Sequence, residues 1–131
     1  MFMKYHCAML ERTYTVLGMM SGTSCDGLDM ALTRIFYEDG QWRFTILASE
    51  TVEYTQQEKN VLRSLIDLSA MDLIRMNSEW GKYFGERALA FMEQNREFKL
   101  DFIASHGHTV FHQPQQGWTF QMGSGAALAV A

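Results

Sequence analysis

Residues 17–32 of this chain, LGMMSGTSCDGLDMAL, place a short polar stretch between two apolar runs. The first run begins near Tyr14 and ends at Met20; the second begins at Leu28, alternates at first and then becomes continuous. Apolar runs of this length, separated by small polar residues, are typical of β-strands joined by a turn. The segment therefore predicts a strand, a tight polar turn over 21–27 and a second strand.

The turn combines glycines, hydroxyls and a carboxylate. Gly22 and Gly27 allow positive φ and let a ligand approach the backbone closely. Exposed N–H groups and the hydroxyls of Thr23 and Ser24 can hold an anion, and Asp26 can hold a divalent cation with its waters. No GxxxxGK lysine is present, and a strand rather than a helix follows. The composition indicates a Mg-phosphate cradle, although the same residues also suit a plain hairpin turn.

Three strands are expected first, over 14–20, 27–37 and 42–54. Asp39-Gly40, which lies between the second and third, is a strong hairpin signal. Consecutive strands with short turns predict an antiparallel meander. A buried strand over 100–105, a loop over 106–117 and a strand over 118–122 follow later, and the crossover helices between them predict parallel pairing with the meander.

Two helices are expected between these groups of strands. Thr55 and Glu58 have the spacing of a capping box, and the helix should run to about Leu68. Ser69 begins a second helix that should end near Asn95, and residues 123–125 should open a short final helix.

The second helix carries two glycines one turn apart, Gly81 and Gly85. Each costs about 1 kcal/mol relative to alanine inside a helix, so a close packing contact is expected there. Trp80 and Phe84 have the spacing of a ligand-stacking pair, but helical periodicity favours a core position for both.

Three motifs then occur in order: MSGTSCDGLDMAL over 20–32, IASHGHTVFHQP over 103–114 and TFQMGSGA over 119–126. They resemble the signatures of the anhydro-N-acetylmuramic acid kinases, which read close to MSGTSxDG, GSHGQTVxHxP and TLQIGDGA. The resemblance covers almost the whole chain after the first dozen residues.

The resemblance implies an α/β fold, namely an actin-like ATPase (ribonuclease H-like) half-domain whose meander is extended by further strands. It also implies a sugar kinase that uses ATP and Mg²⁺ to open the 1,6-anhydro ring of anhydro-N-acetylmuramic acid. The product is N-acetylmuramic acid 6-phosphate, in bacterial cell-wall recycling in the cytoplasm. We expect residues 1–12 to be flexible or extended and residues 13–131 to form the N-terminal actin-like domain, incomplete at its C-terminal end.

The same resemblance assigns residues to the site. His106 and Gln121 would lie in the substrate cleft, and Mg²⁺ would bind near Asp26. Ser124 would line the sugar pocket or cap the final helix, and His106 is alternatively a loop histidine. The ATP phosphates would be bound by Gly22, Thr23, Ser24, Cys25, Asp26, Gly27, Leu28 and Asp29.

The family's catalytic aspartate is expected downstream of this sequence. We therefore expect the chain to be inactive by itself, and to act as a homo-oligomer or with a complementing C-terminal portion. The alternative is a non-catalytic relative that serves as a binding or interaction module.

Three positions depart from the family pattern. Cys25 replaces an aliphatic residue, His108 replaces Gln, and Ser124 replaces Asp. Cys25 is expected to act as a small hydrophobe, because no neighbouring base would activate its thiol. His108 creates an HxH pair with His106 whose imidazoles should share one face of an extended segment. With His112 this trio has the look of a zinc site, which requires three converging protein ligands for catalysis. The family carries Gln at position 108, however, so we interpret the trio as an accident of substitution and not as a zinc site.

Charge and composition exclude several partners. The chain has 11 basic and 15 acidic residues, a net charge of −4, without a basic cluster. Nucleic acid and anionic membranes are therefore poor partners, and no apolar run reaches the roughly 20 residues of a membrane helix. Cys7 and Cys25 lack CxxC spacing, which suits the reducing cytoplasm.

Overall fold

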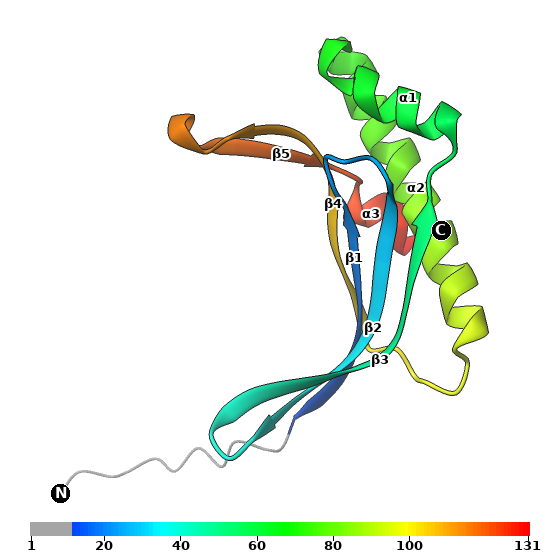
Figure 1. Cartoon of the computed structure of the whole chain (residues 1–131), viewed down its shortest axis with the longest axis vertical. Helices are drawn as coiled ribbons and strands as arrows, with labels where there is room; N and C mark the ends of the chain where they lie inside the picture. Colours follow the sequence, from blue (N-terminus) through cyan, green and yellow to red (C-terminus); the bar gives the residue numbers. More distant parts are fainter. Residues whose placement is uncertain (1–11) are drawn as a thin grey trace, which may run out of the picture.

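The computed structural model describes residues 12–131, so the expectation for the first dozen residues lies almost entirely outside the described part. The chain forms a five-stranded mixed sheet in the order β3-β2-β1-β4-β5 (Figure 1). β1, β2 and β3 form the expected antiparallel meander, β4 pairs parallel with β1, and β5 pairs antiparallel with β4. The strands are β1 Thr13–Ser21, β2 Gly27–Glu38, β3 Gln41–Glu53, β4 Phe102–Gln113 and β5 Trp118–Met122.

The β2–β3 turn follows the local sequence signal. Asp39 and Gly40 have φ values of 49° and 79°, as a two-residue turn of the primed type requires. Tyr37 and Trp42 face each other across the hairpin, with ring centroids 5.3 Å apart. The hairpin signal is therefore confirmed, and β2 and β3 project as a long arm (Figure 1).

The helices begin at the expected caps. Glu58 N donates to Thr55 Oγ1 (3.2 Å) and Thr55 N donates to Glu58 Oε2 (2.7 Å), so the capping box is formed. Ser69 Oγ accepts from Asp72 N at the start of the second helix. The first helix ends earlier than expected and continues as a 3-10 turn. The helices are α1 Gln56–Ser64, the turn Leu65–Asp67, α2 Ala70–Gln94 and α3 Gly125–Ala129.

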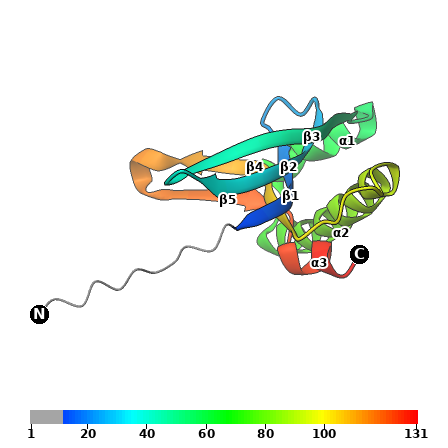
Figure 2. The ribbon, with the colours of Figure 1, turned by 90° about the horizontal axis from the view of Figure 1, so that it is seen from below.

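The core lies between the sheet and α2. Trp80 and Phe84 are 7% and 0% exposed, which confirms that they are core residues. Figure 2 shows the helices gathered on one side of the sheet. Within residues 12–131, no helix lies against the opposite face of the central strands. The largest fully buried side chains are Phe84, Leu17, Leu28, Leu32, Leu65 and Met122.

The two glycines of α2 permit contact with α3. A Cβ at Gly85 would lie 2.7 Å from the carbonyl oxygen of Leu128, and a Cβ at Gly81 would lie 3.0 Å from the Cβ of Ala127. Asn77 also joins the two segments, because its Oδ1 accepts from Gly123 N (2.8 Å). The expected close packing is confirmed, and its partner is the short final helix.

The expectation for residues 100–117 is wrong in two respects. β4 continues through the expected loop to Gln113, because Thr109 and Val110 favour extended backbone and β5 supplies a ladder partner from His108 onward. Its first half is not buried either: Ala104 and Ser105 point to opposite faces of the sheet and both are exposed, so within residues 12–131 neither face of β4 is fully covered here.

Candidate functional site

The turn between β1 and β2 has one internal backbone hydrogen bond, from Cys25 N to Gly22 O (3.1 Å). Cys25 has a φ of 56°, and its side chain is 4% exposed within the core cluster. The prediction that Cys25 acts as a small hydrophobe is confirmed. With this left-handed backbone the thiol lies in the core, while Thr23, Ser24 and Asp26 are exposed.

The turn residues divide by exposure. The side chains of Thr23, Ser24 and Asp26 are exposed, whereas those of Cys25 and Leu28 are buried. The buried pair can therefore reach a ligand only through the backbone. The exposed members carry two hydroxyls and one carboxylate, and such oxygen donors suit phosphate and Mg²⁺.

Both ends of the turn are tied to other strands. At its start, Ser21 Oγ lies 2.8 Å from His108 Nδ1 and accepts a hydrogen bond from the hydroxyl of Tyr54 (2.8 Å). At its end, Tyr54 N donates to Asp26 O (3.0 Å). Burial raises the pKa of Tyr54 to about 12, partly offset by its hydrogen bond to Ser21. Burial lowers the pKa of His108.

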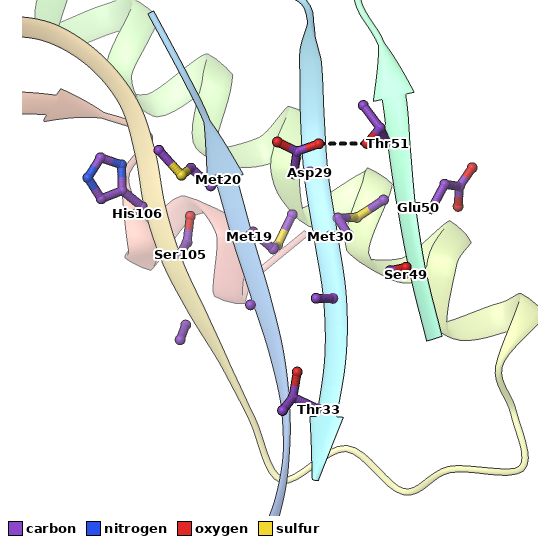
Figure 3. Close-up of a pocket in the computed structure, with 13 residues that line it drawn as sticks. Met19, Met20, Asp29, Met30, Thr33, Ser49, Glu50, Thr51, Ser105 and His106 are labelled. Carbon is purple, nitrogen blue, oxygen red and sulfur yellow. Dashed lines mark hydrogen bonds between the residues drawn. The ribbon is translucent and has the colours of Figure 1, made fainter. Parts of the chain in front are cut away.

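A groove of about 790 Å³ runs across the open face of β3, β2, β1 and β4. Figure 3 shows Asp29 on β2 and His106 on β4, with Met20 of β1 between them. Asp29 Oδ1 accepts a hydrogen bond from Thr51 Oγ1 (2.6 Å). The groove therefore has a carboxylate on one side and an imidazole on the other.

A second groove, of about 610 Å³, opens at the turn itself. Thr23 and Ser24 line it together with His106 and Gln121. His106 lines both grooves, so the space beside the turn adjoins the open face of the sheet. Residues from two distant motifs of the sequence are thus brought to the polar turn.

Ser124 and Asp26 are among the predicted site residues that line neither groove. Ser124 Oγ accepts from Ala127 N (3.3 Å) and caps α3, which is the alternative that the sequence left open. Asp26 lies at the exposed surface of the turn and lines neither of the two grooves. Asp29, by contrast, is the turn-proximal acid that faces the open groove.

The prediction that His106 and His108 share one face is wrong. β4 has a bulge at this point, since Met19 pairs with Ser105 but Ser21 pairs with His108, and Gly107 has a φ of 80°. The extra residue reverses the side-chain alternation, so His106 is exposed and His108 is buried. Within residues 12–131, no group of three or more His, Cys, Asp or Glu residues is placed to hold a metal ion.

Sequence reasoning missed Tyr54. It lies 33 residues from Ser21 and directly precedes a helix cap, where an aromatic residue has no distinctive spacing. The contact between Ser21 and His108 spans 87 residues. No periodicity or local motif connects residues at such distances, so only the sheet pairing reveals the cluster.

The sheet, the helices on one face and the groove on the other define a class: an α/β half-domain of the actin-like sugar-kinase type. Across residues 12–131, no helix is both long and apolar enough to cross a membrane. A family model described as "Anhydro-N-acetylmuramic acid kinase" matches residues 14–131. The chain belongs to the anhydro-N-acetylmuramic acid kinase family.

Individual relatives agree with this assignment. An anhydro-N-acetylmuramic acid kinase of Synechococcus elongatus is 35% identical over 121 residues, covering 87% of this chain and 32% of the relative. The kinase of Bradyrhizobium diazoefficiens is 35% identical over 129 residues, covering 89% of this chain and 34% of the relative. The chain therefore spans about a third of the length of the curated relatives that it matches.

Proposed function

We propose that this chain is the phosphate-binding part of an ATP-dependent anhydro-N-acetylmuramic acid kinase. The complete enzyme would produce N-acetylmuramic acid 6-phosphate during cell-wall recycling in the cytoplasm. The observation that carries the proposal is the polar turn, whose exposed hydroxyls open into a groove shared with His106 and Gln121. A turn of this kind can hold phosphate oxygens through N–H groups and hydroxyls without a lysine.

The turn residues have separate roles in this proposal. Thr23 and Ser24 donate to phosphate oxygens, and the backbone from Gly22 to Gly27 supplies further donors. Asp26, exposed and oxygen-donating, binds Mg²⁺ through its carboxylate or through metal-bound water. Mg²⁺ would compensate the charge of the transferred phosphoryl group when ATP is bound.

The sugar would lie along the open face of the sheet. His106 and Gln121 line the groove at the turn and can hydrogen-bond hydroxyl or amide groups of an amino sugar. Asp29 faces the adjoining groove, where its carboxylate is oriented by Thr51. The family resemblance matches no residue of this sequence to the catalytic base, so we expect no phosphoryl transfer by these 131 residues alone.

Calorimetric titration of the chain with Mg-ATP tests the binding step. Asp26→Asn should weaken binding at low Mg²⁺ by about tenfold or more, and raising the Mg²⁺ concentration should restore part of the loss. The matched control is Asp29→Asn, which removes the same charge three residues further along the chain and should have a smaller effect. Equal affinities for wild type and Asp26→Asn at every Mg²⁺ concentration would show that Asp26 is only a turn residue.

A specific surface also favours association with another polypeptide, which both the kinase and the interaction module would need. An apolar groove of about 390 Å³ lies between α2, α3 and the start of β4, with Leu89, Phe98 and Leu128 among its lining residues. Apolar side chains that gather in an open groove are typical of a site of association. We propose that it receives the remaining two thirds of the kinase as a complementing portion.

Complementation separates the two candidates. The portion of the Synechococcus elongatus kinase beyond the aligned third would be added to this chain as a second polypeptide. Recovered ATP-dependent phosphorylation of the anhydro-sugar supports the kinase reading. A stable complex without phosphorylation supports the interaction module, whereas self-association that excludes the added polypeptide assigns the groove to a second copy of the chain.

A further inference from the structure

A hydrogen-bonded cluster of three buried side chains lies beneath the polar turn. Ser21, His108 and Tyr54 are 0%, 3% and 4% exposed, and both contacts of Ser21 Oγ measure 2.8 Å. Within residues 12–131, Ser21 and His108 are the two polar side chains that the core buries. Buried polar groups contribute to one defined geometry when each has its partner.

The hydrogen bonds of the cluster fit a neutral His108. The hydroxyl of Tyr54 donates to Ser21 Oγ, so the Ser21 hydroxyl proton is available to His108 Nδ1, 2.8 Å away. With the imidazole neutral and its proton on Nε2, Nδ1 accepts that proton and both hydroxyl protons have acceptors. A proton on Nδ1 would turn this acceptor into a donor to Ser21 Oγ and displace the Ser21 proton from His108.

The surroundings of His108 also favour the neutral ring. Burial is the cause of its lowered pKa. On the neighbouring strands, Ser21 and Met122 lie opposite it, and neither carries a charge. Tyr54, which reaches His108 through Ser21, has a pKa of about 12 and is therefore neutral. Glu58 acts on Tyr54 and, together with Arg87, on Tyr83, whose ring packs against that of Tyr54.

The cluster holds both ends of the turn. Ser21 is the last residue of β1 and directly precedes Gly22. Tyr54 donates its backbone N–H to Asp26 O, one residue before β2 begins. Since the turn has a single internal backbone hydrogen bond, its placement depends on these two anchors.

We propose that His108 is a positioning residue for the polar turn: as a neutral imidazole it orients Ser21 and, through Ser21, Tyr54, so that phosphate binding by the turn is lost when the ring is protonated. The statement that phosphate binding is lost rests on the proposed function. The statement that His108 positions the turn concerns the turn alone and holds with or without a nucleotide.

The first measurement needs no ligand. Nitrogen-15 NMR of the purified chain reports the tautomer and the protonation of His108, and amide hydrogen exchange reports the order of residues 22–27. We expect the Nε2-H tautomer at about pH 8. As His108 gains a proton, exchange in the turn should accelerate while exchange in α2 stays constant.

The second measurement is the affinity for Mg-ATP between about pH 8 and pH 5. Only molecules with neutral His108 are competent to bind, so affinity should fall about tenfold for each pH unit below the pKa of His108. ATP itself gains a proton in this range, and His108→Gln corrects for that. Its amide oxygen accepts from Ser21 without titrating, so this variant should bind well and show only the nucleotide's own pH dependence.

One further variant completes the set. His108→Leu removes the acceptor and should bind weakly at every pH. If His108→Leu does not fold, the pH series of wild type and His108→Gln decides the matter.

The results separate the two hypotheses. Identical pH profiles for wild type and His108→Gln, or turn exchange that does not respond to protonation of His108, would overturn the positioning role. Absence of Mg-ATP binding at every pH would overturn the proposed function instead, and the tautomer and exchange data would still decide the role of His108.

Discussion

Gly81→Ala tests how closely α3 must pack on α2. Alanine should stabilise a helix interior by about 1 kcal/mol relative to glycine. At Gly81, however, the new Cβ would lie 3.0 Å from Ser124 N and from Ala127 Cβ, and closer still to Ser124 O. Two of these three atoms belong to the backbone, so a side-chain rotation cannot relieve the contact.

The clash should outweigh the gain in helix propensity. Overpacking of this kind costs about 1–3 kcal/mol. Because the contact with the Ser124 backbone is too close to persist, we expect the upper part of that range, about 2–3 kcal/mol. After the gain of about 1 kcal/mol in helix propensity, the net loss in the free energy of unfolding should be about 1–2 kcal/mol. For a chain of this size, that corresponds to a decrease in melting temperature of several degrees. The displaced segment is the five-residue α3 with its cap Ser124, which follows β5 beside the candidate site.

The assay is urea unfolding together with a melting curve. Ser78→Ala, at an exposed position of the same helix, is the matched control and should be neutral or stabilising by about 0.5 kcal/mol. A Gly81→Ala protein that is as stable as wild type or more stable would refute the packing argument, because helix propensity alone would then account for the measured change in stability.

Three further predictions concern stability, activity and association. The pKa of His108 is lower in the folded state than its unfolded value of 6.5, so its contribution to stability is complete above pH 6.5 and is lost as the pH falls below that value. The loss amounts to about 1.4 kcal/mol for each unit by which the two pKa values differ. Urea titrations above and below pH 6.5 measure this pH dependence, and His108→Gln should abolish it. The purified chain should transfer no phosphate from ATP to anhydro-N-acetylmuramic acid, which a radiolabel assay would contradict by detecting product. The apolar groove at Leu89 and Phe98 should cause self-association or binding of a hydrophobic dye, and a dye-negative monomer in light scattering at high concentration would contradict this.

Elements specified by neighbouring residues were predicted well from the sequence. The Asp39-Gly40 turn and the Thr55 capping box depend on contacts within four residues, and both are formed as expected. Gly81 and Gly85 indicated a close contact without identifying its partner. The meander followed from short turns between apolar runs, because strands joined so closely have few other ways to pair.

The predictions that failed concern residues whose environment comes from distant strands. The extent of β4 depends on β5 as a partner, and the opposite orientations of His106 and His108 depend on a bulge against β1. A one-residue bulge reverses every later side chain in a strand, and nothing in the local sequence marks it except Gly107.

The sequence by itself determined the family, the polar turn and the chemistry of its exposed oxygens, because these reside in short contiguous motifs. Only the tertiary structure decided which of these groups share a space. It placed His106 and Gln121 beside Thr23 and Ser24, made Ser124 a helix cap, and buried His108 against Ser21 and Tyr54. The physical reason is that burial and hydrogen-bond partners arise from sheet pairing across up to 87 residues, a range over which local patterns carry no signal.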